Sequence, residues 1–508
     1  MPASSQRGGA RTAASSSWPG RTSAASCTPA TRSGSTSCPG RSTCSTGAVA
    51  TLLHLGLGSF HRAHQAVYLD RLREAGERSW AIVGGNIRDD GADTLNALAA
   101  QHGAYTLETV SPAGERRYER IRSIREVVPY DPRLARLAEV GADPETRIVS
   151  FTVTEAGYYL DGHDALDLTS PALRADLDGG PPSTLYGALA TILAARLARG
   201  GAPVTLLNCD NLRSNGTRFR AGLLEFLERR GESRLRGWVL ASTACPSAMV
   251  DRITPRPPPD VAARVRAATG EDDRAALMAE SFIQWVIEDR FVAGRPAWER
   301  VGVEMVESVH PYEEAKIRVL NASHSCVAWA GTLRGLSFIH EGMAVPEIRR
   351  MAHAYVTDDV IPSLDTPEHP SPIDLASYRD VVLERFGNRW VQDTNARVAM
   401  DGYAKIPGFV VPTLRECLAR GASIASTAML PALFFAFLGR WQRDALPYRY
   451  QDGTMDPARA HALFAAPDPL ASYAADTTLF GTLAGDPRLL SALRAASERV
   501  RSFVEARP

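Results

Sequence analysis

The run Leu-Leu-His-Leu-Gly-Leu-Gly at residues 52–58 constrains the fold of this chain more than any other segment. It is a short, nearly continuous apolar stretch, and two glycines separated by one residue end it. Such a stretch indicates a buried strand that leads into a turn. Residues 66–72 then have the apolar spacing of a helix. The segment therefore predicts a strand, a turn and a helix in direct succession.

Strand and helix patterns continue to alternate along the first part of the chain. Short β-rich runs lie at 80–84, 147–154 and 203–207, and residues 188–199 have helical character. This alternation is typical of an α/β fold with a parallel, doubly wound sheet. After about residue 307 the strand pattern fades. Helices are predicted there over 313–332, 345–357, 375–386, 392–403 and 424–438.

A chain of 508 residues is expected to form two domains rather than one. We predict an α/β domain over residues 49–306 and a mainly α-helical domain over 307–508. Residues 1–48 contain five arginines and no acidic residue, so we expect this segment to be disordered. An organelle transit peptide is an alternative. A second alternative is that residues 1–48 are a non-native extension. No Met lies between Met1 and Met249, so the true start would then be at a codon other than Met, near Val49.

Charge and cysteine usage exclude several classes of partner. The formal net charge is zero and the pI is about 7.2, which argues against nucleic acid and anionic membranes. The apolar run at 428–439 is too short to span a bilayer. The seven cysteines include no C-x-x-C pair, so neither a zinc site nor a disulfide framework is predicted. We expect a cytoplasmic protein with reduced thiols, either a monomer or a small homo-oligomer.

Lysine usage points to a candidate catalytic residue. The chain has 55 arginines but only two lysines, Lys316 and Lys405. Lysine can lose its proton when it is desolvated, whereas arginine stays charged. Asn321 and His324 follow Lys316 within one predicted helix, about 140° and 80° around its axis at 100° per residue. A neutral amine, an amide donor and a histidine on one face suit proton removal from an alcohol. A chance polar face is the alternative.

The glycine turn is a candidate cofactor site. Gly56 and Gly58 match the first two glycines of a dinucleotide fingerprint, which lets backbone approach a pyrophosphate. His61 occupies the third glycine position, so an ordinary glycine turn is the alternative. The acid expected to bind the adenosine ribose should follow the second strand, where Asp89 and Asp90 lie. An acid there favours NAD over NADP, although Arg88 beside it weakens this prediction.

Six segments together carry a family resemblance. They are HLGLGSFHRAHQAVYLD (54–70), TVTEAGYY (152–159), LLNCDNLRSNG (206–216), MVDRITP (249–255), PYEEAKIRVLNASHS (311–325) and DGYAKIPGF (401–409). Their order and spacing resemble the long-chain polyol dehydrogenase family, which contains mannitol 2-dehydrogenase, fructuronate reductase and D-arabinitol 4-dehydrogenase. Residues 306–335 and 427–453 resemble the D-arabinitol 4-dehydrogenase branch more than the mannitol branch.

The resemblance implies a Rossmann-like N-terminal domain, a mainly helical C-terminal domain, and a zinc-independent active site between them that uses NAD. It implies that Lys316 is the general base and that His324 binds the reacting oxygen. Asn321 and Asn211 would donate to that oxygen, and Glu313 would relay the proton to solvent. The resemblance further assigns substrate binding to Asp251, Arg397 and Lys405, and cofactor binding to Gly56, Gly58, Phe60, Arg62 and Glu155.

Two departures from the family pattern affect these expectations. Residues 1–48 have no counterpart, and Tyr403-Ala404 replaces a pair that usually ends in Ser before Lys405. The substrate's distal contacts are therefore open. We predict NAD-dependent oxidation of a linear sugar alcohol to a ketose, D-arabinitol to D-xylulose. Mannitol 2-dehydrogenase or fructuronate reductase is the alternative, because Arg397 and Lys405 could meet a carboxylate. A catalytically silent nucleotide-binding sensor is the alternative from another class.

Overall fold

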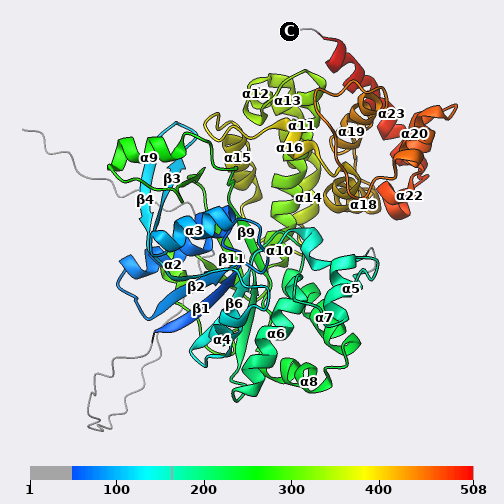
Figure 1. The fold of residues 1–508 in the computed structure, drawn as a ribbon. Helices are drawn as coiled ribbons and strands as arrows, with labels where there is room; N and C mark the ends of the chain where they lie inside the picture. The colour runs from blue at the N-terminus through cyan, green and yellow to red at the C-terminus, as the bar shows by residue number, and fades with distance from the viewer. Residues whose placement is uncertain (1–48, 162–163, 507–508) are drawn as a thin grey trace, which may run out of the picture.

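The glycine-ended apolar run forms β1 (Ala50–Leu55), the third strand of a six-stranded parallel sheet. The computed structural model describes residues 49–161 and 164–506, so the predictions for residues 1–48 lie outside the described residues. Figure 1 shows the strands in the left part and most of the later helices in the upper right part.

The order of the strands identifies the fold of the N-terminal part. Across the sheet they run β5 (Ile124–Val128), β2 (Trp80–Gly85), β1, β6 (Thr146–Phe151), β7 (Val204–Asn208) and β8 (Thr243–Ala244). In order of appearance along the chain this is 3-2-1-4-5-6, the doubly wound order of dinucleotide-binding folds. The prediction of an α/β, Rossmann-like domain is confirmed.

Both faces of this sheet are buried, which explains the continuous apolar pattern of its central strand. On one face Leu52 packs in a cluster with Leu69 of α2, and on the other Leu53 and Leu55 pack with Leu189 of α6. The helices of this part are α1 (Ser59–Ala63), α2 (Gln65–Glu74), α3 (Ala92–Ala100), α4 (Ala135–Ala142), α5 (Pro171–Leu177), α6 (Leu185–Ala198), α7 (Asn215–Arg229), α8 (Ser233–Ser242) and α9 (Val261–Thr269).

Two three-stranded sheets connect this domain to the helical part. One has the order β10 (Leu277–Glu280), β3 (Tyr105–Val110), β4 (Arg116–Ile121), and the other β12 (Glu304–Val306), β11 (Gln284–Glu288), β9 (Ala248–Asp251). Two carboxylates, Asp251 and Glu280, are the last residues of β9 and β10. The ends of these two strands thus place acidic side chains against an arginine of the helical part, Arg385.

The helical part starts with one long helix that changes its winding. It runs through α10 (His310–Ala315), the π-helical segment η3 (Lys316–Asn321) and α11 (Ala322–Leu333). Two further π-helical segments, η4 (Tyr355–Val360) and η5 (Ile406–Val410), pack against η3. The other helices are α12 (Ile339–Ala344), α13 (Pro346–Ala354), α14 (Ile361–Leu364), α15 (Leu375–Phe386), α16 (Asn395–Ala399), α17 (Gly402–Lys405), α18 (Val411–Ala419), α19 (Met429–Gln442), α20 (Pro457–Ala465), α21 (Pro469–Ala474), α22 (Thr477–Phe480) and α23 (Pro487–Glu505).

The predicted helices of this part are mostly confirmed, and the helix over 375–386 has the bounds of α15. The single helix predicted over 392–403 is wrong. The chain there forms α16 and α17, which are separated at Met400 and Asp401, and Asp401 adopts a left-handed conformation with φ of 56°. Within the described residues, no helix has both the length and the apolar character needed to cross a membrane.

Candidate active site

Lys316 lies where the two parts of the molecule meet. It is the first residue of η3, and its side chain is almost fully buried, with 6% of its surface exposed. Its Nζ donates a hydrogen bond to Oδ1 of Asn211, which follows the carboxyl end of β7. Ligands of open α/β sheets bind beyond the carboxyl ends of the strands. The amine therefore faces the edge of the sheet where a ligand is expected.

The surroundings of Lys316 weaken its hold on a proton. Burial lowers the pKa of the amine below its ordinary value, because a charged group loses hydration there. The carboxylates of Asp251, Glu313 and Asp210 oppose this effect, and the guanidinium of Arg385 adds to it. The net pKa is lowered, as a general base requires.

Glu313 lies three residues before Lys316 and is also buried, with 4% of its surface exposed. Its carboxylate accepts the backbone N–H of Ser214 at 3.1 and 3.2 Å. Burial raises the pKa of Glu313 to about 7, although Ser214 and Arg213 partly oppose the rise. A small pocket lined by both Glu313 and Lys316 leaves about 10 Å³ for the centre of a water, the lower limit for one molecule. The carboxyl group of Glu313 can therefore take up and release a proton near neutral pH.

Asp251 is held by an arginine from the helical part. Arg385, in α15, donates from Nη1 and Nη2 to Asp251 at 2.7 and 3.0 Å. The same guanidinium donates from Nε and Nη2 to Glu280 at 3.0 and 2.7 Å. Burial alone would raise the pKa of Asp251, but Arg385, with smaller contributions from Lys316 and His64, outweighs burial and the net pKa is lowered. Asp251 is therefore a fixed negative charge beside Lys316.

His324 belongs to a second group of polar side chains. Its ring stacks on Phe386 with the ring centres 4.4 Å apart, and Nε2 lies 3.4 Å from Oδ2 of Asp393. That approach is within ion-pair distance but lacks the geometry of a hydrogen bond. Asp393 also accepts two hydrogen bonds from Arg397, at 2.6 and 2.5 Å. Burial lowers the pKa of His324, so the ring is neutral at physiological pH. Lys405 adds a further nearby positive charge.

The remaining residues predicted to bind or orient the substrate include two that already make contacts within the protein, Lys405 and Arg397. Lys405 donates from Nζ to the carbonyl of Val398 at 2.6 Å, and burial lowers the pKa of this amine to about 8. The side chain of Arg397 is 62% exposed despite its contacts with Asp393. Asn321 is half-buried at the end of η3.

The helical spacing argument for Lys316 and Asn321 is wrong in its geometry. It assumed α-helical winding, whereas residues 316–321 form the π-helical turn η3. A π-helix joins residues five apart through the backbone, so it aligns Lys316 with Asn321 more closely than an α-helix would. Such insertions are frequently found at functional sites. The amine and the amide therefore lie one turn apart on the same side of the helix.

The glycine turn follows β1 at the point where the strand order reverses. Gly56 has φ of 106°, and a Cβ there would lie 3.1 Å from the carbonyl oxygen of Thr152. A Cβ at Gly58 would meet nothing within 4 Å, so the turn leaves open space next to its backbone. The N–H of Leu57 donates to Oδ1 of Asn86 at 2.9 Å, which fixes the turn against the end of β2. This open backbone at the switch point fits the pyrophosphate of a dinucleotide.

The other predicted cofactor residues differ in where they lie. Asp89 and Asp90 are exposed in the loop after β2. Phe60 is half-buried and stacks on the ring of His64 at 5.0 Å. Arg62 is turned into the interior, where it donates to the carbonyl of Ala275 at 2.5 Å, so the structure does not bring it to the turn surface. The side chain of Glu155 lies outside the described residues.

Sequence reasoning missed three residues that organise the site: Asn86, Arg385 and Asp393. Asn86 follows the second strand, and that position was a signal that could have found it. Arg385 is one arginine among 55 and pairs with residues more than 100 positions away, so no local pattern marks it. Asp393 lies four residues before Arg397, a spacing that permits pairing on one helical turn.

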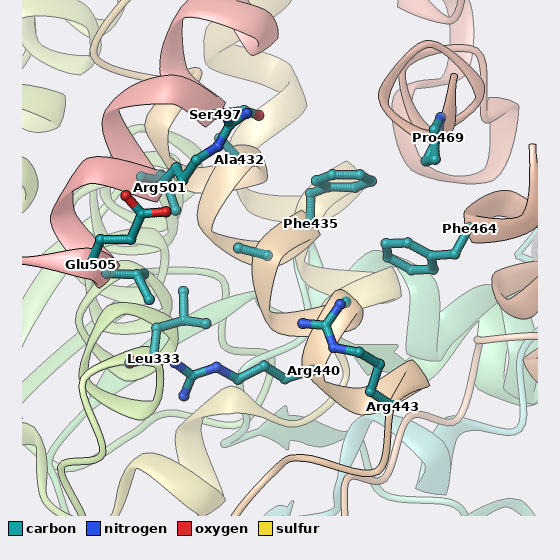
Figure 2. A pocket seen from close by; sticks show the side chains of 14 residues that line it. Leu333, Ala432, Phe435, Arg440, Arg443, Phe464, Pro469, Ser497, Arg501 and Glu505 are labelled. Atoms are coloured by element: carbon teal, nitrogen blue, oxygen red, sulfur yellow. Dashed lines mark hydrogen bonds between the residues drawn. The ribbon is translucent and has the colours of Figure 1, made fainter. Parts of the chain in front are cut away.

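A separate pocket of about 390 Å³ lies within the helical part, away from Lys316. Figure 2 shows Ser497 and Arg501 of α23 on one side, Phe464 of α20 on the other, and Phe435 of α19 between them. None of the predicted site residues lines this pocket. Within residues 49–161 and 164–506, no group of three or more His, Cys, Asp and Glu side chains is arranged to hold a metal ion.

Comparison with known proteins places the chain in a family. The family model for the mannitol dehydrogenase Rossmann domain matches residues 50–300, and that for the mannitol dehydrogenase C-terminal domain matches residues 308–501. The chain is 62% identical to a D-arabinitol 4-dehydrogenase of Ralstonia nicotianae, over 91% of this chain and 99% of that protein. It is 54% identical to a D-arabinitol 4-dehydrogenase of Klebsiella pneumoniae, over 87% and 96%.

A solved structure agrees with these sequence matches. The ternary complex of Pseudomonas fluorescens mannitol 2-dehydrogenase with NAD and D-mannitol superposes with a TM-score of 0.77 at 33% identity. The match covers 90% of this chain and 94% of that one. The two domain matches, the relatives and the fold agree, and the chain belongs to the mannitol dehydrogenase family.

Proposed function

We propose that this protein is an NAD-dependent polyol dehydrogenase that oxidises D-arabinitol to D-xylulose. The observation that carries the proposal is the buried amine of Lys316, which is bonded to Asn211 at the carboxyl edge of the sheet and has a lowered pKa. The choice of D-arabinitol is supported by the two D-arabinitol 4-dehydrogenases that are 62% and 54% identical to the chain. We place the reaction in the cytoplasm, where the reduced thiols expected from the sequence would persist.

The residues around the glycine turn fit NAD. The open backbone at Gly58 would receive the pyrophosphate, and Asp89 or Asp90 would bind the adenosine ribose. A 2′-phosphate would meet the negative charge of these carboxylates, which favours NAD over NADP. When bound, NAD supplies the acceptor for the hydride that leaves the alcohol carbon. All other steps fall to side chains of this chain.

Proton removal is assigned to Lys316. Its neutral amine would take the proton of the reacting hydroxyl as the C–H bond breaks and the C=O bond forms. Asn211 already accepts from Nζ through Oδ1, so its amide N–H₂ is left to donate to the substrate oxygen. Asn321, one π-helical turn away, would donate to the same oxygen, and His324 would bind it. These donors stabilise the charge that develops on the oxygen.

The proton then has a defined route away from the base. Glu313, with a pKa of about 7, shares a water-sized pocket with Lys316 and would accept the proton before releasing it to solvent. Arg397 and Lys405, near His324, would contact the distal hydroxyls of the polyol. Asp251 would fix the charge around the base. These assignments of individual residues are part of the proposal.

The proposal is tested by mixing the purified protein with NAD and single polyols and measuring NADH formation. D-Arabinitol should give the highest kcat/KM, and D-mannitol a lower one. Preference for D-mannitol, or activity only with fructuronate and NADH, would show that the protein carries out the same kind of hydride transfer on a substrate other than D-arabinitol. Tight binding of NAD without turnover of any polyol would instead identify a nucleotide-binding sensor.

A further inference from the structure

Arg385 is shared between two buried carboxylates that belong to the other domain. It projects from α15 of the helical part, and 4% of its surface is exposed. Its partners Asp251 and Glu280 end β9 and β10 of the N-terminal part, and each is bound through two hydrogen bonds. The guanidinium also lies 3.9 Å from the centre of the Phe282 ring. Planar pairing on both sides and stacking on one face fix its position.

The charged and titratable groups around Lys316 come from five different segments of the fold. They are Asp251 at the end of β9, Glu313 in α10, Asp210 in the loop after β7, Arg385 in α15 and His64 before α2. Of the carboxylates, Asp251 favours the charged amine most strongly, and Arg385 is the strongest positive charge that opposes it. His64 is buried and its pKa is lowered to about 3, so it is neutral at physiological pH.

Arg385 and Lys316 both act on the charge of Asp251, whose pKa each of them lowers. Asp251 could form an ion pair with a protonated Lys316, which would hold the proton on the amine and remove its lone pair from use. Instead both oxygens of Asp251 accept from Arg385. Arg385 keeps its own charge, because Asp251 and Glu280 outweigh the effect of burial on its pKa. Asp251 is therefore paired with Arg385 and not with Lys316.

We propose that Arg385 is a positioning residue that withholds Asp251 from Lys316 and thereby keeps the amine available as a base. Arg385 does not touch the reacting atoms in this account, and it acts through Asp251. Because the arginine comes from the helical part and the carboxylates from the N-terminal part, the base is activated only when the two parts are joined. This inference rests on the proposed function for its role in catalysis, but the charge relation itself can be tested without substrate.

The two-lysine composition makes a direct test possible. With isotope-labelled lysine, the NMR spectrum contains one Cε resonance for Lys316 and one for Lys405, and a K405R sample assigns them. The pH titration of the Lys316 resonance is then recorded without NAD or polyol in the wild type, in R385Q and in E280Q. R385Q removes the positive charge, whereas E280Q alters the other partner of the same guanidinium and leaves that charge in place.

We expect the titration midpoint of Lys316 to rise by about one pH unit or more in R385Q, as for a group that gains an opposite charge nearby. In E280Q the midpoint should stay at or below the wild-type value. An unchanged or lowered midpoint in R385Q would overturn the proposal. A rise in E280Q equal to that in R385Q would also overturn it, because loosened packing would then explain both.

If R385Q does not fold, the double variant R385Q/E280Q decides the question, since it removes one positive and one negative charge together. The midpoint should rise in it as well, and a midpoint at the wild-type value would refute the role of Arg385. With D-arabinitol and NAD, the pH dependence of kcat should move with the NMR midpoint. Wild-type protein that forms no NADH refutes the proposed function alone, because the titration without substrate still tests Arg385.

Discussion

The role proposed for position 316 requires a lysine, and another cation would not serve. Arginine there would keep the positive charge and much of the side-chain volume, but its pKa is too high for it to act as a base. We expect kcat for D-arabinitol oxidation to rise with pH in the wild type, through a pKa below the ordinary value of 10.5 for lysine, because only the neutral amine can take the proton. K316R should lose at least about 10²-fold in kcat at every pH. If kcat of K316R had the same value and the same increase with pH as kcat of the wild type, Lys316 would not be the general base.

We expect the carboxylate of Glu313 to lower the free energy of unfolding at neutral pH. Its pKa is raised from 4.5 to about 7 in the folded protein, so the folded state binds this proton more tightly than the unfolded state. The free energy of unfolding should therefore fall as pH rises from about 4.5 to 7, by at most about 3 kcal/mol. Denaturant unfolding of E313Q at pH 5 and pH 8 tests this.

The E313Q variant should lose that part of the pH dependence and be more stable than the wild type at pH 8. It should also be slower in turnover, because the amide cannot accept the proton from Lys316. Equal pH dependence in the two proteins would show that Glu313 titrates normally in the folded state.

At the scale of elements, the two glycines of the turn should have different roles. We expect Gly56 to matter for the stability of the fold and Gly58 for binding of the cofactor. G56A forces an alanine to φ of 106° with its Cβ 3.1 Å from the carbonyl of Thr152, and it should cost about 1–3 kcal/mol of stability. G58A is the matched control, because φ is −74° and its Cβ meets no protein atom within 4 Å. We expect G58A to fold normally but to bind NAD at least about tenfold more weakly, since its methyl occupies the open space. Urea unfolding measures the effect on stability, and NAD titration measures the effect on binding. A normal NAD affinity in G58A would show that the pyrophosphate does not bind next to Gly58.

The sequence predicts those elements whose signals are local. The strand β1, its turn and the bounds of α15 follow from apolar spacing and glycine. The π-helical turn η3 was not predicted, because its residues are ordinary helix formers and its neighbours η4 and η5 come from distant parts of the chain. The break between α16 and α17 was missed because Asp401 adopts a positive φ, which residues other than glycine rarely do.

At the scale of the whole molecule, the site depends on contacts between distant segments. Lys316 was found from the rarity of lysine in the chain, and the role predicted for its partner Asn211 came from the family resemblance. The Arg385 pairs join α15 to strands that precede it by 134 and 105 residues. Spacing along the chain carries no information on such pairs, because only the tertiary fold brings them together.

Cofactor choice should be visible in the stability of the intact protein. A ligand that binds only the folded state raises the unfolding temperature, and at equal concentration a tighter ligand raises it more. NAD should therefore raise Tm more than NADP at equal concentration, since Asp89 and Asp90 would repel the 2′-phosphate. In D89N/D90N the difference should narrow, as measured by differential scanning calorimetry. A larger shift with NADP in the wild type would reverse the assigned preference.

The central claim is that an uncharged amine at position 316 takes the proton from a polyol hydroxyl. It is tested most directly by comparing NADH formation from D-arabinitol by the wild type and K316A, each saturated with NAD, with NAD affinity measured separately. The account predicts a loss of about 10³-fold or more in kcat with NAD affinity unchanged within about twofold. Turnover by K316A within tenfold of the wild type would contradict it.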